Sequence, residues 1–232
     1  METEELIRKY NSYRNSTINL QASENILSQK AASALSSDMA SRYSLFVDGY
    51  NAYGGTYYFD KILEILENNV KKLFGSPYSE SRALSGHIAA EISIISALSN
   101  IKNNKNVMAI NESDGGYPGY QQNNMGNMLG FNFHQIPYEN YKIKYEELES
   151  AIKTVHPGII ILGQSVFIMP YDMVQIHEMA EKYGIKILYD ASHVMGLIAG
   201  GSFQPDAMKY SDIVYGSTHK TFFGPQGGII LT

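Results

Sequence analysis

The sequence lacks cysteine and tryptophan altogether, and it has few basic residues for its 232 positions. Without cysteine the chain has no disulfide framework, no thiolate zinc site and no cysteine nucleophile. Its 18 lysines and arginines are outnumbered by 23 acidic residues, which gives a net charge of −5. This acidic balance, with no long cluster of Lys and Arg, argues against nucleic acid as the main partner.

Long hydrophobic runs are missing as well. No stretch of about 18 apolar residues exists, so we expect no membrane-spanning segment. The first nine residues, METEELIRK, lack the apolar stretch of a signal peptide. With 44% hydrophobic and 18% charged residues, the composition excludes a disordered protein. We therefore expect a soluble, cytoplasmic, globular protein.

Short apolar runs alternate with helical patterns along most of the chain. Strands are expected at 107–110, 131–136, 159–162, 185–189, 213–215 and 229–231. Helices are expected at 3–15, 29–40, 60–74, 87–98, 145–155 and 171–183. Near-continuous apolar strands that alternate with helices predict an α/β fold, in which helices cover both faces of a mainly parallel sheet.

The first part of the chain has a different character. Residues 1–30 combine a short polar helix with an extended segment at 17–25, and they predict an N-terminal arm that packs on another domain or subunit. Residues 31–232 form the predicted large domain. Residues 43–58 are rich in tyrosine and glycine, and they predict a long loop with an interface or functional role.

Polar residues follow several of the predicted strands. In open parallel sheets ligands bind at the carboxyl ends of the strands. Asp190 and His193 follow the strand at 185–189, and Lys220 follows the next strand in glycine-rich sequence. Each has an ordinary alternative, since an aspartate here can cap the next helix and a lysine is most often a solvated surface group.

A lysine and a carboxylate together suit pyridoxal phosphate. The lysine amine holds the cofactor's aldehyde as a Schiff base, and the carboxylate keeps its pyridine nitrogen protonated. Ser85 and Gly86 open the helix at 87–98, whose N-terminus suits a phosphate, although Ser85 is also explained as a simple N-cap. Tyr117 either stacks on the flat ring or merely packs.

At these positions the sequence resembles serine hydroxymethyltransferase, a fold-type-I pyridoxal-phosphate enzyme. The matching stretches run from about residue 17 to the end and are Leu20–Asn25, Tyr53–Gly55, Leu73–Gly75, Leu84–Gly86, Met108–Asn111, Asp190–Leu197, Thr218–Thr221 and Gly224–Leu231. The resemblance implies the large domain of the aspartate aminotransferase-like, pyridoxal-phosphate-dependent transferases.

The resemblance also implies catalytic roles. Lys220 would hold the cofactor, with His219 beside it. Asp190 would pair with the pyridine nitrogen, and His193 would lie near the phenolic oxygen. Tyr117 stands where the family has a histidine that stacks on the ring.

Further residues match the family's binding positions. Ser85, Gly86 and His87 would bind the phosphate, with His87 replacing a second serine. Ser165 would approach the phenolic oxygen. Three residues would contact the substrate: Ser23, Tyr43 and Tyr53. Because the tyrosine loop of this family reaches a neighbouring subunit's site, we expect a homodimer or a higher homo-oligomer. No metal is expected.

The activity implied is the reversible conversion of serine to glycine, with the one-carbon unit carried by tetrahydrofolate. Several positions depart from the pattern. Leu45 replaces an acid–base glutamate, for which a shifted loop would have to supply Asp48. Glu112 falls in the folate-contacting region, and Gln226 replaces an arginine. Two alternatives therefore stay open: a folate-independent aldolase or racemase of β-hydroxy amino acids, and a non-catalytic fragment or interaction protein.

The position of the last residue gives one further expectation. Thr232 directly follows the final predicted strand at 229–231, whereas the family continues into a C-terminal domain with an arginine for the substrate carboxylate. We therefore expect an incomplete large domain without that C-terminal domain. We also expect the final strand to leave an unfinished sheet edge.

Overall fold

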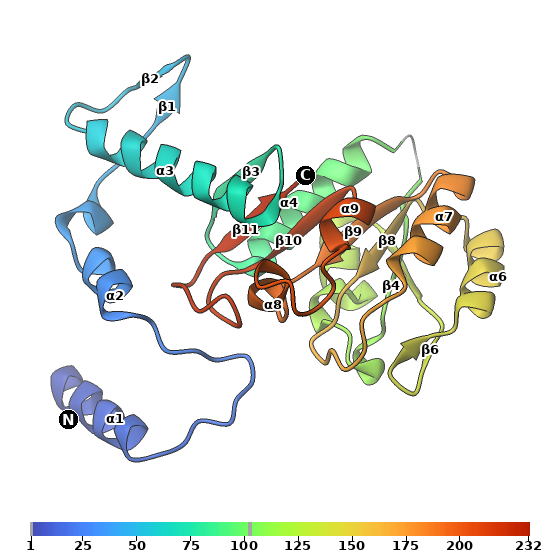
Figure 1. The fold of residues 1–232 in the computed structure, drawn as a ribbon, viewed down its shortest axis with the longest axis horizontal. Coiled ribbons are helices and arrows are strands. Elements are labelled where there is room, and N and C mark those ends of the chain that lie inside the picture. The colour runs from blue at the N-terminus through green and yellow to red at the C-terminus, as the bar shows by residue number, and fades with distance from the viewer. Residues whose placement is uncertain (1, 102–103) are drawn as a thin grey trace.

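The centre of the molecule is a seven-stranded, mainly parallel sheet (Figure 1). The computed structural model describes residues 2–101 and 104–232. In spatial order the strands are β3 (Ser79–Ala83), β11 (Gly228–Leu231), β10 (Ile213–Ser217), β9 (Lys186–Asp190), β8 (Ile159–Leu162), β4 (Asn106–Ala109) and β5 (Asn132–Gln135). Neighbouring strands from β10 to β5 run parallel, and β11 runs antiparallel to both β10 and β3. This confirms the predicted α/β fold.

Side chains of the central strands alternate between two apolar cores, one on each face of the sheet. In β9, Ile187 and Tyr189 belong to one core and Leu188 to the other. The helices that contribute to the first core are α3 (Tyr57–Phe74), α6 (Tyr145–Val155), α7 (Met173–Tyr183), α8 (Met195–Ala199) and α9 (Ala207–Tyr210). The second core is covered by α4 (Gly86–Ser99). Because both faces are buried, the central strands are apolar along nearly their whole length.

Two helix ends show how the sequence determines where a helix begins or ends. Ser85 caps α4, since its Oγ accepts the backbone N–H of Ile88 at 3.2 Å. Helix α3 ends at Phe74 because Gly75 takes a left-handed conformation with φ of 66°, and its N–H bonds to the carbonyl of Lys71. The predicted helices at 60–74, 87–98, 145–155 and 171–183 are confirmed.

The chain before α3 lies outside the sheet. It contains α1 (Thr3–Asn15), α2 (Gln29–Leu35) and a hairpin of β1 (Phe46–Val47) and β2 (Tyr50–Asn51). None of the residues of α1 or α2 is buried, and both helices (blue in Figure 1) lie apart from the sheet. The division into an arm at 1–30 and a domain at 31–232 stays a prediction.

Several expectations were wrong. Strand β11 does not leave an open edge, because it pairs with β3, and β3 was not predicted. The loop at 43–58 is not irregular throughout: it contains the β1–β2 hairpin, and α3 begins at Tyr57. A second hairpin, β6 (Tyr138–Glu139) with β7 (Lys142–Ile143), was also not predicted. Among the described residues, no helix combines the length and hydropathy needed to cross a bilayer.

Candidate active site

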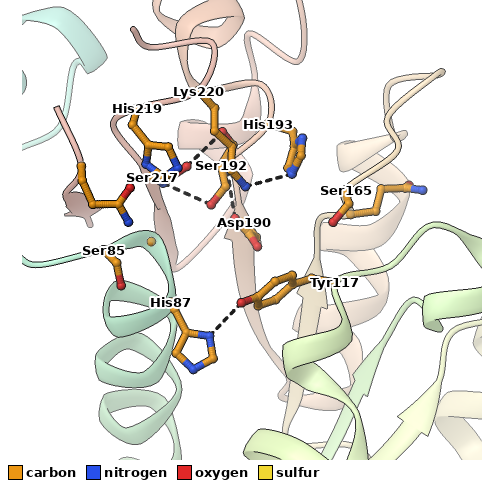
Figure 2. Close-up of a pocket in the computed structure, with 13 residues that line it drawn as sticks. Ser85, His87, Tyr117, Ser165, Asp190, Ser192, His193, Ser217, His219 and Lys220 are labelled. Atoms are coloured by element: carbon orange, nitrogen blue, oxygen red, sulfur yellow. Dashed lines mark hydrogen bonds between the residues drawn. The ribbon is translucent and has the colours of Figure 1, made fainter. Parts of the chain in front are cut away.

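A cavity of about 280 Å³ opens where the carboxyl ends of β9 and β10 meet the N-terminus of α4 (Figure 2). It is lined by Ser85, Gly86, His87, Tyr117, Gln164, Ser165, Asp190, Ser192, His193, Ser217, His219, Lys220 and Gln226. The lining contains every residue that the sequence predicts to be catalytic or cofactor-binding. Four lining residues were not among the predicted site residues: Gln164, Ser192, Ser217 and Gln226.

Asp190 ends β9 and is only 8% exposed. Its Oδ1 accepts the backbone N–H of Ser192 at 2.9 Å, and its Oδ2 accepts the hydroxyl of Tyr120 at 2.5 Å. The first bond is a local turn of the kind that aspartate favours. It does not cap the next helix, α8, whose N-cap residue is Val194. The carboxylate nevertheless lines the cavity and is fixed by a donor at each oxygen.

Lys220 is not a solvated surface lysine. It is half-buried, and its Nζ lies 2.9 Å from Nε2 of His193. Burial lowers the pKa of the Lys220 amine, against the opposing effect of the Asp190 carboxylate. Burial, together with the nearby Lys220 amine, lowers the pKa of His193 to about 4. At neutral pH His193 is therefore an uncharged acceptor facing the lysine.

The loop that carries Lys220 is held on both sides by hydrogen bonds. Thr218 Oγ1 donates to the carbonyl of Pro225 at 2.5 Å, and Thr221 Oγ1 accepts the N–H of Gly196 at 3.2 Å. Beside the lysine, burial and the Lys220 amine lower the pKa of His219. His219 Nδ1 is buried and has no hydrogen-bond partner within the described part of the chain.

The N-terminus of α4 forms the opposite wall. The first N–H groups of a helix have no intrahelical partner, and their partial positive charge favours an anion. Here the first helical residues are Gly86 and His87. A Cβ at Gly86 would lie 2.8 Å from Cβ of Ser217 and 2.9 Å from its backbone N, so only glycine lets α4 approach β10 this closely.

Tyr117 is tied to α4 across the cavity. Its hydroxyl lies 2.8 Å from Nδ1 of His87 (Figure 2). Nε2 of His87 in turn lies 3.0 Å from a carboxylate oxygen of Glu91. The Tyr117 ring also packs edge-on against Tyr120, with ring centroids 5.2 Å apart. Burial raises the pKa of the Tyr117 phenol, and the Asp190 carboxylate adds to the effect. The hydroxyl is therefore a stable donor or acceptor at neutral pH.

Gln164 and Ser165 follow β8 and form a further part of the wall. The backbone N–H of Ser165 donates to the carbonyl of Gly115 at 2.8 Å. Gln164 is 3% exposed, and its Oε1 accepts the hydroxyls of Tyr171 at 2.6 Å and Tyr138 at 3.1 Å. These contacts hold the strand end in place.

The predicted substrate-contacting residues do not reach this cavity in the same chain. Tyr43 and Tyr53 stack with centroids 5.4 Å apart and line a second cavity. Ser23 is partly exposed, and its Oγ accepts a hydrogen bond from the Gln21 side chain. The arm does reach the lysine loop at one point, where Asn25 Nδ2 donates to the carbonyl of Lys220 at 2.9 Å.

The residues that depart from the expected sequence pattern lie in different parts of the structure. Gln226 lines the active-site cavity, whereas Leu45 and Asp48 lie at the β1–β2 hairpin. Glu112 lines another cavity next to Asp114. In this chain, then, neither Leu45 nor Asp48 forms part of the cavity that contains Lys220.

The cavity brings four chemical features together. These are an amine with a lowered pKa, a buried carboxylate, an aromatic side chain and a helix N-terminus with free N–H groups. A ligand that carries an electrophilic carbon, a flat ring and an anionic group would meet a complementary partner for each.

Comparison with known proteins gives consistent matches. A family model described as serine hydroxymethyltransferase matches residues 1–232. The serine hydroxymethyltransferase of Methanothermobacter marburgensis is 38% identical over 229 residues, which cover 98% of this chain and 53% of the relative. Those of Methanobrevibacter smithii and Pyrococcus abyssi are each 34% identical, covering 100% and 97% of this chain and 55% and 52% of theirs. The chain thus spans about half the length of the curated relatives it matches.

Proposed function

Because this chain belongs to the serine hydroxymethyltransferase family, we propose that it binds pyridoxal phosphate and acts in the reversible conversion of serine to glycine, with tetrahydrofolate as the one-carbon carrier. The observation that carries this proposal is the presence of Lys220 and Asp190 in one cavity with the N-terminus of α4. A lysine amine, a carboxylate and an anion site are the groups that this cofactor requires.

The side chains present fit the cofactor. The phosphate would be held by Ser85 and the N–H groups of Gly86 and His87, and the pyridine nitrogen would face Asp190. Tyr117 would stack on the ring, and Ser165 would lie near the phenolic oxygen. When bound, the cofactor supplies an electron sink that stabilises negative charge on the amino acid's α-carbon.

The protonation states of the chain suit this use. The pKa of Lys220 is lowered by burial, which makes its amine a better nucleophile at neutral pH. His193 is uncharged at neutral pH because burial lowers its pKa to about 4. With His193 neutral, its Nε2 can accept a hydrogen bond from the Lys220 amine and orient that amine across the cavity. Because His219 directly precedes Lys220 in the chain, we propose that it supports the lysine.

The substrate side of the site would come from a second copy. Ser23, Tyr43 and Tyr53 lie away from the cavity of their own chain. We therefore propose a homodimer in which the tyrosines of one chain contact the amino acid bound by the other.

The cofactor part of the proposal is tested by absorbance. Protein supplied with pyridoxal phosphate should develop a band near the edge of the visible range, and Lys220→Ala should abolish it. Lys209→Ala, which removes an exposed lysine on α9, is the control and should leave the band unchanged. Wild-type protein without such a band would contradict the proposal. Exchange of the glycine α-proton or interconversion with serine, measured with and without tetrahydrofolate, then tests the reaction.

A further inference from the structure

Two buried tyrosine hydroxyls stand behind Asp190. Tyr120 ends a short 3-10 helix (Pro118–Tyr120), Tyr215 lies in β10, and both are 0% exposed. Tyr120 donates to Asp190 Oδ2 at 2.5 Å, and the hydroxyls of Tyr120 and Tyr215 are 2.7 Å apart. Because the proton of Tyr120 is committed to the carboxylate, Tyr215 must donate to Tyr120. The result is a directed chain of hydrogen bonds from Tyr215 through Tyr120 to Asp190.

The fold places this chain through strand register. Tyr215 is the direct partner of Asp190 in the parallel β9–β10 pair. Tyr120 comes from a separate segment after β4 and reaches the same carboxylate. Three elements that are distant in the sequence therefore converge on one carboxylate oxygen.

The second oxygen of Asp190 is held independently by the N–H of Ser192. With one donor at each oxygen, the carboxylate plane cannot rotate without breaking a buried hydrogen bond. Each carboxylate oxygen can accept more than one hydrogen bond, so the group keeps capacity for a ligand N–H on its cavity side. The arrangement fixes the direction of the carboxylate and leaves it open to a ligand.

The protonation of the two phenols supports a donor role. Burial, with the adjacent Asp190 carboxylate, raises the pKa of Tyr120 and of Tyr215 well above the usual value for tyrosine. Both hydroxyls are therefore protonated at neutral pH, where each can donate a hydrogen bond.

A neighbouring tyrosine shows that burial alone does not demand such bonds. Tyr189 is also 0% exposed, but its side chain belongs to the core on the opposite face of the sheet. Its hydroxyl has no hydrogen-bond partner among residues 2–101 and 104–232. The contrast separates tyrosines that merely fill a core from the pair that contacts Asp190.

We propose that Tyr120 and Tyr215 are positioning residues that hold the Asp190 carboxylate toward the ring nitrogen of the cofactor. This inference rests on the proposed binding of pyridoxal phosphate. Tyr120 acts on Asp190 directly, and Tyr215 acts through Tyr120. Loss of the Tyr120 hydroxyl should therefore weaken the contact between the carboxylate and the ring nitrogen more than loss of the Tyr215 hydroxyl.

The test compares two ligands and three variants. Binding of pyridoxal phosphate, and of its 1-deaza analogue with carbon in place of the ring nitrogen, is measured by titration of absorbance and of intrinsic tyrosine fluorescence. Tyr120→Phe should weaken binding of pyridoxal phosphate by about tenfold, the lower end expected for a hydrogen bond to a charged group. Tyr215→Phe should weaken it by a smaller factor. Tyr189→Phe, the matched control, should leave it unchanged.

The analogue distinguishes positioning from general support of the fold. It has no ring nitrogen to meet Asp190, so Tyr120→Phe should bind it as the wild type does. Equal losses for both ligands, or no loss for either, would overturn the inference. If Tyr120→Phe does not fold, as judged by thermal unfolding, the same comparison with Tyr215→Phe decides. Wild-type protein that binds neither ligand would instead overturn the proposed function itself.

Discussion

His87 and Tyr117 are two departures from the serine hydroxymethyltransferase pattern that one hydrogen bond joins. The resemblance places a serine at 87 and a histidine at 117. In this chain an imidazole stands at 87 and a phenol at 117, and His87 Nδ1 and the Tyr117 hydroxyl lie 2.8 Å apart. Because Glu91 holds the other ring nitrogen of His87, the aromatic ring facing Asp190 is anchored from α4. The two departures thus form one hydrogen-bonded pair that keeps an aromatic wall.

The half-buried imidazole of His193 predicts a pH-dependent stability that does not depend on the cofactor. Its pKa falls from 6.5 to about 4 on folding, so the unfolded chain binds more protons between these values. Stability from this group is fully present above pH 6.5 and is lost as the pH falls toward 4. Allowing for partial exposure, we expect a loss of about 1 kcal/mol between pH 7 and pH 5.

Urea unfolding at the two pH values measures this loss. His193→Gln places at this position an amide that can accept a hydrogen bond from Lys220 but does not titrate. Between pH 7 and pH 5 the variant should therefore lose about 1 kcal/mol less unfolding free energy than the wild type. His219 titrates in the same direction and is present in both proteins, so it cancels in the comparison. Equal losses for wild type and variant would refute a depressed pKa at His193.

At the scale of elements, the apolar strands and amphipathic helices were predictable because each segment shows a single hydrophobic pattern along its whole length. Strand β3 was not, since its sequence, Ser79–Ala83, is mostly polar and partly exposed, as an edge position allows. The β1–β2 and β6–β7 hairpins escaped prediction because two-residue strands have too few positions to show an alternation. Whether such segments form strands is decided by tertiary pairing rather than by their own sequence.

The residues of the candidate site likewise include some that the sequence could predict and some that it could not. Asp190, Lys220 and Ser85 were predictable because they follow strands or begin a helix at the expected sheet edge. Tyr120 and Tyr215 were not, because Tyr120 lies in a polar stretch with Pro118 and Gly119, and Tyr215 lies in what looks like an ordinary core strand. Only the β9–β10 register and the return of the chain after β4 bring their hydroxyls to Asp190.

The approach of α4 to β10 predicts a large effect of a small substitution. For Gly86→Ala, helix propensity would favour alanine by up to about 1 kcal/mol. Against this, the new Cβ would lie 2.9 Å from the backbone N of Ser217, which cannot rotate away. Overpacking of this kind costs about 1–3 kcal/mol, so we expect net destabilisation and weaker binding of pyridoxal phosphate.

Thermal unfolding and cofactor titration of Gly86→Ala measure both effects. Gly200→Ala is the matched control, because its Cβ would meet no atom closer than 3.4 Å and its φ is −83°. We expect the control to stay within about 0.5 kcal/mol of the wild type. A Gly86→Ala protein as stable as the control would show that α4 can move from β10 without cost.

At the scale of the whole molecule, the N-terminal region is short of partners for its apolar side chains. Leu20 and Ile26 are each 88% exposed, and Tyr43 is 74% exposed. Large exposed apolar surface of this kind marks an interaction site. Tyr43 and Tyr53 also line a cavity that shares none of its residues with the one containing Lys220. Both observations favour a second copy of the chain as the partner.

A symmetric dimer with shared sites makes a quantitative prediction for mixed variants. Lys220→Ala removes the amine from a chain's own cavity, and the double variant Tyr43→Phe, Tyr53→Phe alters only what that chain offers its partner. The phenylalanines keep the ring packing of the tyrosine pair. Each variant alone should show little serine–glycine interconversion. After joint refolding, half of the dimers should be mixed, and each should contain one intact site.

The mixture should therefore recover about a quarter of the wild-type activity, while light scattering gives twice the 25.9 kDa chain mass for every sample. The mass measurement matters because a variant that failed to dimerise would also fail to complement. Dimers without any recovery would mean that Tyr43 and Tyr53 serve no partner site. A mass of 25.9 kDa for the wild type would refute the dimer itself. Only sites built from two chains predict recovery together with the doubled mass.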